Sequence, residues 1–181
     1  MMAVFTFRRN GRVSRQAASE QASGSRNTGD GKGRELTDGK LKVYGDSRSG
    51  NCYKVQLLCA EMGIEYDWQE VDIIAGETRT PEFLEMNPNG KIPLLALPDG
   101  SHLPESNAIL FYLADGSEFF VGDTLARAEI LQWMFFEQYS HEPYIATARF
   151  IIKYLGNPPD KRATLAEKSA GGRKALETME Q

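Results

Sequence analysis

The chain has 181 residues, of which 41% are hydrophobic and 25% charged, enough material for one good hydrophobic core or two small ones. Its net charge of −4 is unevenly distributed, because residues 1–40 carry +4 and residues 41–181 carry −8. An acidic body argues against nucleic acid as the main partner, and no run approaches the roughly 18 apolar residues that a membrane-spanning helix needs. The composition therefore predicts a cytoplasmic protein that binds small ligands or other proteins.

Residues 1–40 are rich in Gly, Ser and Arg and show no sustained hydrophobic period. Such a segment cannot bury enough apolar surface to offset the entropy of ordering, so we expect a disordered N-terminal extension. Its first nineteen residues contain arginines and no acids, which superficially resembles an organelle transit peptide. An extension without a fold is the favoured interpretation.

Residues 41–73 predict a strand, a helix and a second strand. The first strand, at 41–44, runs into a polar turn at 46–51. Apolar side chains then recur at helical spacing up to Gly63, which stands where a C-terminal cap is expected. These side chains are Val55, Leu58, Cys59 and Met62. A second strand is expected at residues 66–73.

A short helix and a hairpin come next. Thr80-Pro81-Glu82 combines an N-cap, a proline at the first helical position and a first-turn acid, which predicts a helix that ends at Asn87-Pro88. Residues 91–97 and 102–103 flank Pro98-Asp99-Gly100, a turn signal between two strands. This segment therefore adds one helix and two strands.

Ser106 is expected to open a further apolar helix, which runs through residues 109–114 and ends at Gly116. The order is then βαβ followed by ββα. It matches the thioredoxin-like layout, a small mixed sheet with helices packed against it. We therefore expect an α/β thioredoxin-like domain at residues 41–117.

Residues 124–181 predict helices without strands. One helix begins near Thr124, a second runs from about Glu142 to Tyr154, and a third segment from Lys161 is expected to be interrupted by Gly171-Gly172. This half is short of apolar residues, so we expect an all-α, incomplete C-terminal helical domain. The side chains that mark one face of its first helix are Leu131, Met134 and Phe135.

Ser49-Gly50-Asn51-Cys52 lies between the first strand and the first helix, where redox members of the thioredoxin-like fold carry Cys-x-x-Cys. A hydroxyl at this point can donate a hydrogen bond to a bound thiolate, and the helix N-terminus adds positive partial charge. Both effects lower a thiol's pKa from about 8.5. The alternative is that Ser49 only caps the helix. Cys52 is interpreted as a packed small apolar residue, and no disulfide with Cys59 is expected.

Two further motifs lie at element ends. Pro93 falls inside a strand that looks buried, where proline removes a ladder donor. A cis Ile92–Pro93 bond would expose the Ile92 backbone to a peptide ligand, whereas a trans proline on an edge strand is the alternative. At Glu105-Ser106, the hydroxyl and nearby N–H groups can hold a carboxylate while Glu105 meets an ammonium. An N-cap preceded by a solvated acid is the alternative there.

Together these motifs resemble the N-terminal domain of glutathione transferases over residues 41–114. The runs that carry the resemblance to serine-type bacterial, theta-like and phi-like members are Ser49-x-x-Cys52, Asn87-Pro-Asn-Gly-Lys-Ile-Pro93 and Glu105-Ser-Asn-Ala-Ile-Leu110. The resemblance implies that Ser49 activates the glutathione sulfur. It also implies that Ile92, beside Pro93, pairs with the tripeptide backbone and that Glu105 and Ser106 hold the γ-glutamyl end. Arg79 and Lys91 are the candidates for the glycine carboxylate, with solvated surface charges as the alternative.

The resemblance implies a glutathione transferase that joins glutathione, as co-substrate, to a small hydrophobic electrophile, with no metal or other cofactor and a role in detoxification. Two alternatives are a glutathione-dependent thiol-disulfide reductase that uses Cys52 and a non-catalytic glutathione-binding or assembly module. A homodimer is implied as well. The chain stops before the late helices of the family. Aromatic residues of the run at 135–144 are interpreted as core, with the electrophile pocket as the alternative.

Overall fold

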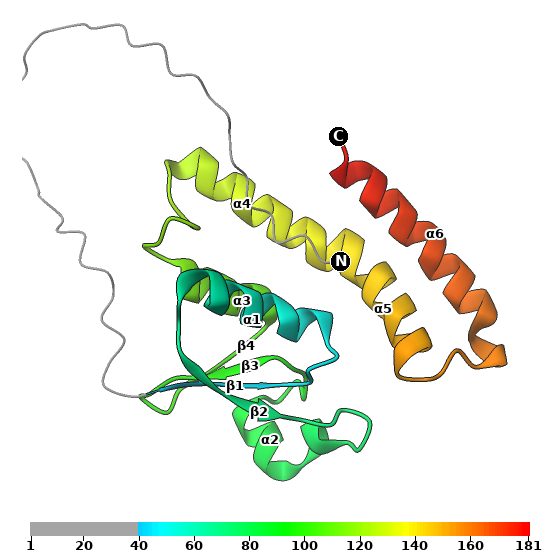
Figure 1. Cartoon of the computed structure of the whole chain (residues 1–181), viewed down its shortest axis with the longest axis horizontal. Coiled ribbons are helices and arrows are strands. Elements are labelled where there is room, and N and C mark those ends of the chain that lie inside the picture. The colour runs from blue at the N-terminus through cyan, green and yellow to red at the C-terminus, as the bar shows by residue number, and fades with distance from the viewer. Residues whose placement is uncertain (1–39) are drawn as a thin grey trace, which may run out of the picture.

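The computed structural model describes residues 40–181, so the disorder expected for residues 1–39 lies outside the described residues. An α/β half comes first and a helical half second (Figure 1). The α/β half consists of β1 (Leu41–Gly45), α1 (Gly50–Met62), β2 (Tyr66–Glu70), the 3₁₀ turn η1 (Glu77–Arg79), α2 (Pro81–Met86), β3 (Leu94–Ala96), β4 (His102–Pro104) and α3 (Ser106–Ala114). The helical half consists of α4 (Thr124–Phe136), the π-helical turn η2 (Glu137–His141), α5 (Glu142–Lys153), the 3₁₀ turn η3 (Pro159–Lys161) and α6 (Arg162–Met179).

The α/β half is built on a four-stranded mixed sheet with the order β2-β1-β3-β4. β1 runs parallel to β2 and antiparallel to β3, and β3 and β4 form an antiparallel hairpin. A parallel pair needs a crossover connection, and α1 provides it. α1 and α3 cover one face of the sheet and α2 covers the other (Figure 1). This is a thioredoxin-like fold, as the element order predicts.

Alternation along the strands produces a core on each face of the sheet. Leu41 and Val43 of β1 and Leu95 of β3 point toward α1 and α3 and are almost fully buried. Leu94 of β3 points the other way and packs with Phe83 of α2. β3 therefore carries apolar residues on both of its faces, since helices cover the sheet on both sides.

The first helix forms where its signals predict. The Ser49 side chain caps its N-terminus, and Gly63 ends it in the left-handed conformation at φ 64°. Val55, Leu58 and Cys59 form its buried face. The start of α1 next to the end of β1 brings Ser49 to the edge of the sheet where the candidate site lies.

Two strands are shorter than the sequence predicts. β2 ends at Glu70 rather than Ile73, because its partner β1 ends opposite at Gly45. β3 begins at Leu94 rather than Lys91, because Leu94 is the first residue of β3 that pairs with β1. Pro93 therefore precedes the strand instead of interrupting it. The Ile92–Pro93 bond is cis, as the sequence analysis proposed.

The helical half differs from the prediction at two points. The α6 helix runs without interruption through Gly171 and Gly172. A side chain at Gly172 would approach Ile145 Cδ1 to 2.6 Å, so these glycines let α6 pack closely on α5. Phe135 was predicted on the inner face of α4, but it is 68% exposed. None of the helices between residues 40 and 181 is long and apolar enough to cross a membrane.

Candidate functional site

A cleft of about 570 Å³ lies where the α/β half meets α5. Every residue that the sequence analysis selected for a site lines this cleft: Ser49, Arg79, Lys91, Ile92, Pro93, Glu105 and Ser106. Four elements that are distant in sequence are thereby brought together. The helical half adds residues that sequence reasoning missed, namely Gln138, Glu142 and Phe150.

Ser49 occupies the N-cap position of α1. Its Oγ accepts a hydrogen bond from the Cys52 amide at 3.4 Å, and its own amide donates to the Asp46 carbonyl at 2.9 Å. The capping alternative is therefore realised. Capping engages an oxygen lone pair and leaves the hydroxyl proton for another acceptor, so capping is compatible with donation to a ligand. The first turn of α1 contains no acid that would oppose a bound anion.

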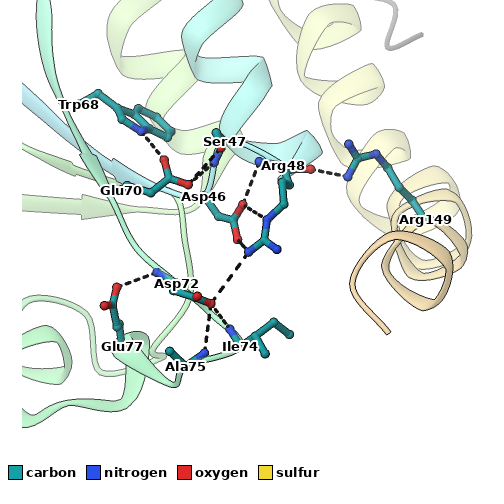
Figure 2. A network of polar contacts seen from close by, with 10 residues as sticks. All are labelled: Asp46, Ser47, Arg48, Trp68, Glu70, Asp72, Ile74, Ala75, Glu77 and Arg149. Carbon is teal, nitrogen blue, oxygen red and sulfur yellow. Dashed lines mark hydrogen bonds and ion pairs between the residues drawn. The ribbon is translucent and has the colours of Figure 1, made fainter. Parts of the chain in front are cut away.

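The loop that carries Ser49 is tied to a buried carboxylate (Figure 2). The Asp46 side chain is 0% exposed. It accepts hydrogen bonds from the Arg48 amide at 2.8 Å, from Nε at 3.0 Å and from Nη2 at 2.8 Å. Burial alone would raise the pKa of Asp46, but the contacts with Arg48 outweigh it and hold the pKa below its usual value.

The same loop is tied to the end of β2 on its other side (Figure 2). Glu70 Oε1 accepts from the Ser47 amide at 2.9 Å and from its hydroxyl at 3.1 Å. Trp68 Nε1 donates to the second carboxylate oxygen at 2.7 Å. The backbone bond from Ser47 lowers the pKa of Glu70, and this carboxylate therefore acts as an ionised anchor for the loop.

Basic side chains line the cleft from η1 and from the segment before Pro93. Arg79 Nη1 donates to the Asn89 carbonyl at 3.2 Å. Gly90 has a φ of 58°, and a side chain there would come within 2.6 Å of Arg79 Nη1. Asn87 is buried and its Nδ2 donates to the Lys91 carbonyl at 2.8 Å. These contacts explain the Asn-Pro-Asn-Gly run, because its amides and glycine set the course of the backbone into Ile92.

The start of α3 also lines the cleft. Glu105 has a φ of 71°, which is unusual for a residue with a side chain. α3 begins at Ser106, as the sequence predicts, and Glu105 holds the N-cap position, so the alternative of Ser106 as N-cap is not realised. The Ser106 side chain is buried, and its Oγ donates to Asn51 Oδ1 at 3.4 Å. Strained backbone of this kind is typical of ligand-binding positions.

A polar cluster joins the starts of α1 and α3 to the helical half. Asn51 Nδ2 donates to Glu142 Oε1 at 3.1 Å, and Gln138 Nε2 donates to Ser106 Oγ at 3.4 Å. Deeper in the seam, Lys54 is 7% exposed and its Nζ lies 2.6 Å from Glu137 Oε2. Sequence reasoning missed this cluster. The signal that could have revealed it is a lysine on the otherwise apolar face of α1.

Cys52 lies beneath the Ser49 loop and is 0% exposed. Burial raises the pKa of its thiol to about 11. A thiol of this kind is protonated at neutral pH and out of contact with solvent, which disfavours the reductase hypothesis that depends on Cys52. Both cysteines are free. Between residues 40 and 181, no group of three or more His, Cys, Asp or Glu side chains is arranged to hold a metal ion.

Comparison with known proteins finds a matching family model and similar structures. Residues 48–115 match the model described as "Glutathione S-transferase, N-terminal domain". A crystal structure of glutathione S-transferase from Pseudomonas fluorescens Pf-5 shares 56% identity at a TM-score of 0.76, covering 78% of this chain and 71% of that one. The glutathione transferase URE2P6 from Phanerochaete chrysosporium, solved with oxidized glutathione, shares 28% identity at a TM-score of 0.69, covering 78% and 66%.

A curated relative has a different description. The "Transcriptional regulator URE2" of Saccharomyces cerevisiae is 35% identical over 115 residues, which are 59% of this chain and 32% of that protein. The chain thus spans about a third of the length of this curated relative.

Proposed function

This chain belongs to the glutathione S-transferase family, and from that premise we propose that it binds glutathione in the cleft beside Ser49 and joins the tripeptide through its sulfur to a small hydrophobic electrophile. The single observation that carries the proposal is that Ser49, Ile92 and Ser106, from separate motifs, line one cleft. Relatives support the glutathione part, since the Phanerochaete chrysosporium transferase was solved with oxidized glutathione.

The charged side chains that line the cleft are complementary to the anionic and cationic groups of glutathione. Arg79 and Lys91 offer two cations for the glycine carboxylate, and Glu105 offers a carboxylate for the γ-glutamyl ammonium. The backbone of Ile92, which lies outside the β-ladder, is available to the peptide groups between them. The central cysteine of the tripeptide then faces Ser49 and the N-terminus of α1.

Ser49 is proposed as the catalytic residue. Its hydroxyl donates a hydrogen bond to the glutathione sulfur, and the amide dipoles at the start of α1 favour the thiolate over the thiol. The thiol proton leaves to solvent. The thiolate then forms a sulfur–carbon bond with the electrophile while the bond to the leaving group breaks, and the leaving group departs with its electron pair. Ordered binding of both reactants lowers the barrier further.

Phe150 of α5 is the proposed apolar contact for the electrophile. It lines the cleft with Ser49 and stacks on Tyr154 at a centroid distance of 4.9 Å. The aromatic residues of the run at 135–144, for which the sequence predicts a core role with the electrophile pocket as the alternative, are not among the residues that line the cleft. A homodimer, a cytoplasmic location and a role in detoxification complete the proposal.

The test of the serine is a titration of the thiol of bound glutathione. In Ser49→Ala we expect the pKa of that thiol to rise toward the value of free glutathione and kcat to fall by about 10²-fold, because a donor to the developing anion is lost. Ultraviolet absorbance of the thiolate measures the pKa, and turnover of a model aryl halide measures kcat.

Ser49→Thr is the matched control, because it keeps both the hydroxyl and the helix cap. It should retain a thiol pKa close to that of the unmodified protein. An unchanged pKa of the bound thiol in Ser49→Ala would show that the assigned role of Ser49 is wrong.

A non-catalytic glutathione-binding module is the second candidate. The observation that favours it is that part of this chain is similar in sequence to a protein described as a transcriptional regulator. Calorimetry with glutathione, followed by turnover assays with several electrophile classes, separates the two candidates. Tight binding without turnover of any electrophile would favour the module over the enzyme.

A further inference from the structure

Arg48, the residue before Ser49, contacts both halves of the molecule. Toward the α/β half, its guanidinium makes a two-pronged contact with the carboxylate of Asp46. Toward the helical half, the guanidinium carbon lies 4.4 Å from the centre of the Tyr154 ring, just beyond α5. One side chain thus joins the serine loop to α5.

The backbone of the loop is held from the same helix. Arg149 of α5 donates from Nη1 to the carbonyl of Arg48 (Figure 2). Arg48 Nη2 also lies 3.9 Å from Asp72 Oδ1, on the loop that follows β2. Three separate segments therefore meet at the residue next to Ser49.

The buried carboxylate makes these contacts necessary for the position of Ser49. Asp46 is fully buried, and a buried charge without a partner carries a large desolvation cost. If Arg48 is removed, the carboxylate loses its two-pronged partner, and we expect the loop to shift so that water reaches it. The same residue holds Ser49 in place, because the Asp46 carbonyl accepts from the Ser49 amide at 2.9 Å. Movement of Asp46 therefore displaces the serine.

Arg48 is also connected to the proposed contact for the electrophile. The Tyr154 ring on which it lies stacks on Phe150, with 25° between the ring planes. Phe150 lines the cleft together with Ser49. The position of the serine and the position of the aromatic wall are thus set by contacts of the same guanidinium.

We infer that Arg48 is a positioning residue, which holds Ser49 at the correct distance from α5 by neutralising Asp46 and stacking on Tyr154. The catalytic meaning of this inference rests on the proposed function, but the bracing of the loop can be measured without glutathione. Lysine cannot substitute, because a single ammonium neither spans both carboxylate oxygens nor stacks as a planar group.

Cys52 provides a readout of the loop that needs no ligand. Its amide donates to Ser49 Oγ at 3.4 Å and its side chain is 0% exposed, so we expect the sulfur to become accessible when the loop opens. Cys59 is buried in the core between the sheet and α1 and reports unfolding of the whole α/β half. The measurement is the rate at which a thiol reagent modifies each cysteine, resolved by mass spectrometry of peptides.

In Arg48→Met we expect the modification rate of Cys52 to rise about tenfold or more, while the rate of Cys59 stays within about twofold. Arg48→Lys should change the two modification rates in the same way, and it replaces Arg48→Met in the test if that variant folds poorly. Arg162→Met, at an exposed position of α6, is the matched control and should change neither rate. Equal acceleration of both cysteines, or acceleration of neither, would overturn the inference.

The second readout connects the brace to catalysis. In Arg48→Lys, kcat should fall about tenfold and the pKa of the bound glutathione thiol should rise, whereas the KM for glutathione stays within about twofold because Ile92, Glu105 and Ser106 are unchanged. A normal kcat and thiol pKa in a variant with an accessible Cys52 would contradict the positioning role. If the unmodified protein itself does not lower the thiol pKa, the proposed function is wrong, and the cysteine rates still decide whether Arg48 braces the loop.

Discussion

At the scale of single residues, the positions of Ser49 and Cys52 separate two chemistries that their spacing alone leaves open. Both belong to the first turn of one helix and its cap, yet Ser49 lines the cleft while Cys52 is buried beneath it. Burial raises the pKa of the cysteine to about 11, so the buried sulfur is a poor nucleophile at neutral pH. The reactive sulfur is therefore proposed to be that of bound glutathione.

We therefore predict that Cys52→Ala keeps glutathione-dependent turnover within about twofold of the unmodified protein. The free energy of unfolding should fall by roughly 1–2 kcal/mol, because the substitution leaves a small cavity in the core. Assays of conjugation and of disulfide reduction, together with urea unfolding, measure both effects. Selective loss of disulfide reduction in a stable variant, with Cys59→Ala unaffected, would restore Cys52 as a nucleophile.

At the scale of elements, the α5–α6 hairpin shows how packing overrides local propensity. Glycine in a helix interior costs about 1 kcal/mol relative to alanine, and two adjacent glycines favour a break. α6 nevertheless continues through Gly171 and Gly172, whose missing side chains make room for Tyr144 and Ile145 of α5. Close contact between the helices compensates for the weak propensity.

The sign of a substitution at Gly171 tests this explanation. If the position were free, Gly171→Ala would stabilise the helix by about 1 kcal/mol. The added methyl instead meets the Tyr144 ring, so we expect a loss of about 1–3 kcal/mol in the free energy of unfolding. Urea unfolding measures it, and combining Gly171→Ala with Tyr144→Leu should recover part of the loss. Stabilisation by the single substitution would show that α5 and α6 are not closely packed here.

At the scale of the whole molecule, the seam between the halves contains an ion pair within a cluster of polar side chains. Lys54 of α1 meets Glu137 of the π-helical turn, and Asn107 of α3 accepts from the same ammonium at 3.1 Å. Burial lowers the pKa of Lys54, and the nearby carboxylate of Glu137 opposes that shift. Glu137 is the first residue of the π-helical turn that connects α4 to α5.

We predict that Glu137→Gln lowers the free energy of unfolding by about 2 kcal/mol, because it leaves the buried ammonium without its counter-charge. Chemical unfolding measures the loss. The double variant Lys54→Met with Glu137→Leu should recover most of it, since neither charge then remains buried. Asp160→Asn removes one partner of an exposed pair with Lys161 and should change stability by less than about 0.5 kcal/mol. A similar effect of both carboxylate substitutions would mean that the seam is solvated.

Local signals were sufficient for most elements and for the motif residues of the site. Helix caps and apolar spacing predicted α1, α2 and α3, and the order of elements predicted the thioredoxin-like fold. Strand ends were predicted less well, since a strand ends where its partner ends. The roles assigned to all seven site residues stay predictions, although all of them line the cleft.

The sequence by itself determined which backbone segments are helical or extended and which polar residues stand at their ends, because caps, turns and periodicity act within a few residues. The packing of Cys52, which the sequence predicts, is confirmed. Tertiary structure alone decided that Arg48 bridges Asp46 and Tyr154 and that Lys54 meets Glu137 across the seam. Burial and charge pairing depend on residues far apart in the chain, and only the folded packing brings those residues into contact.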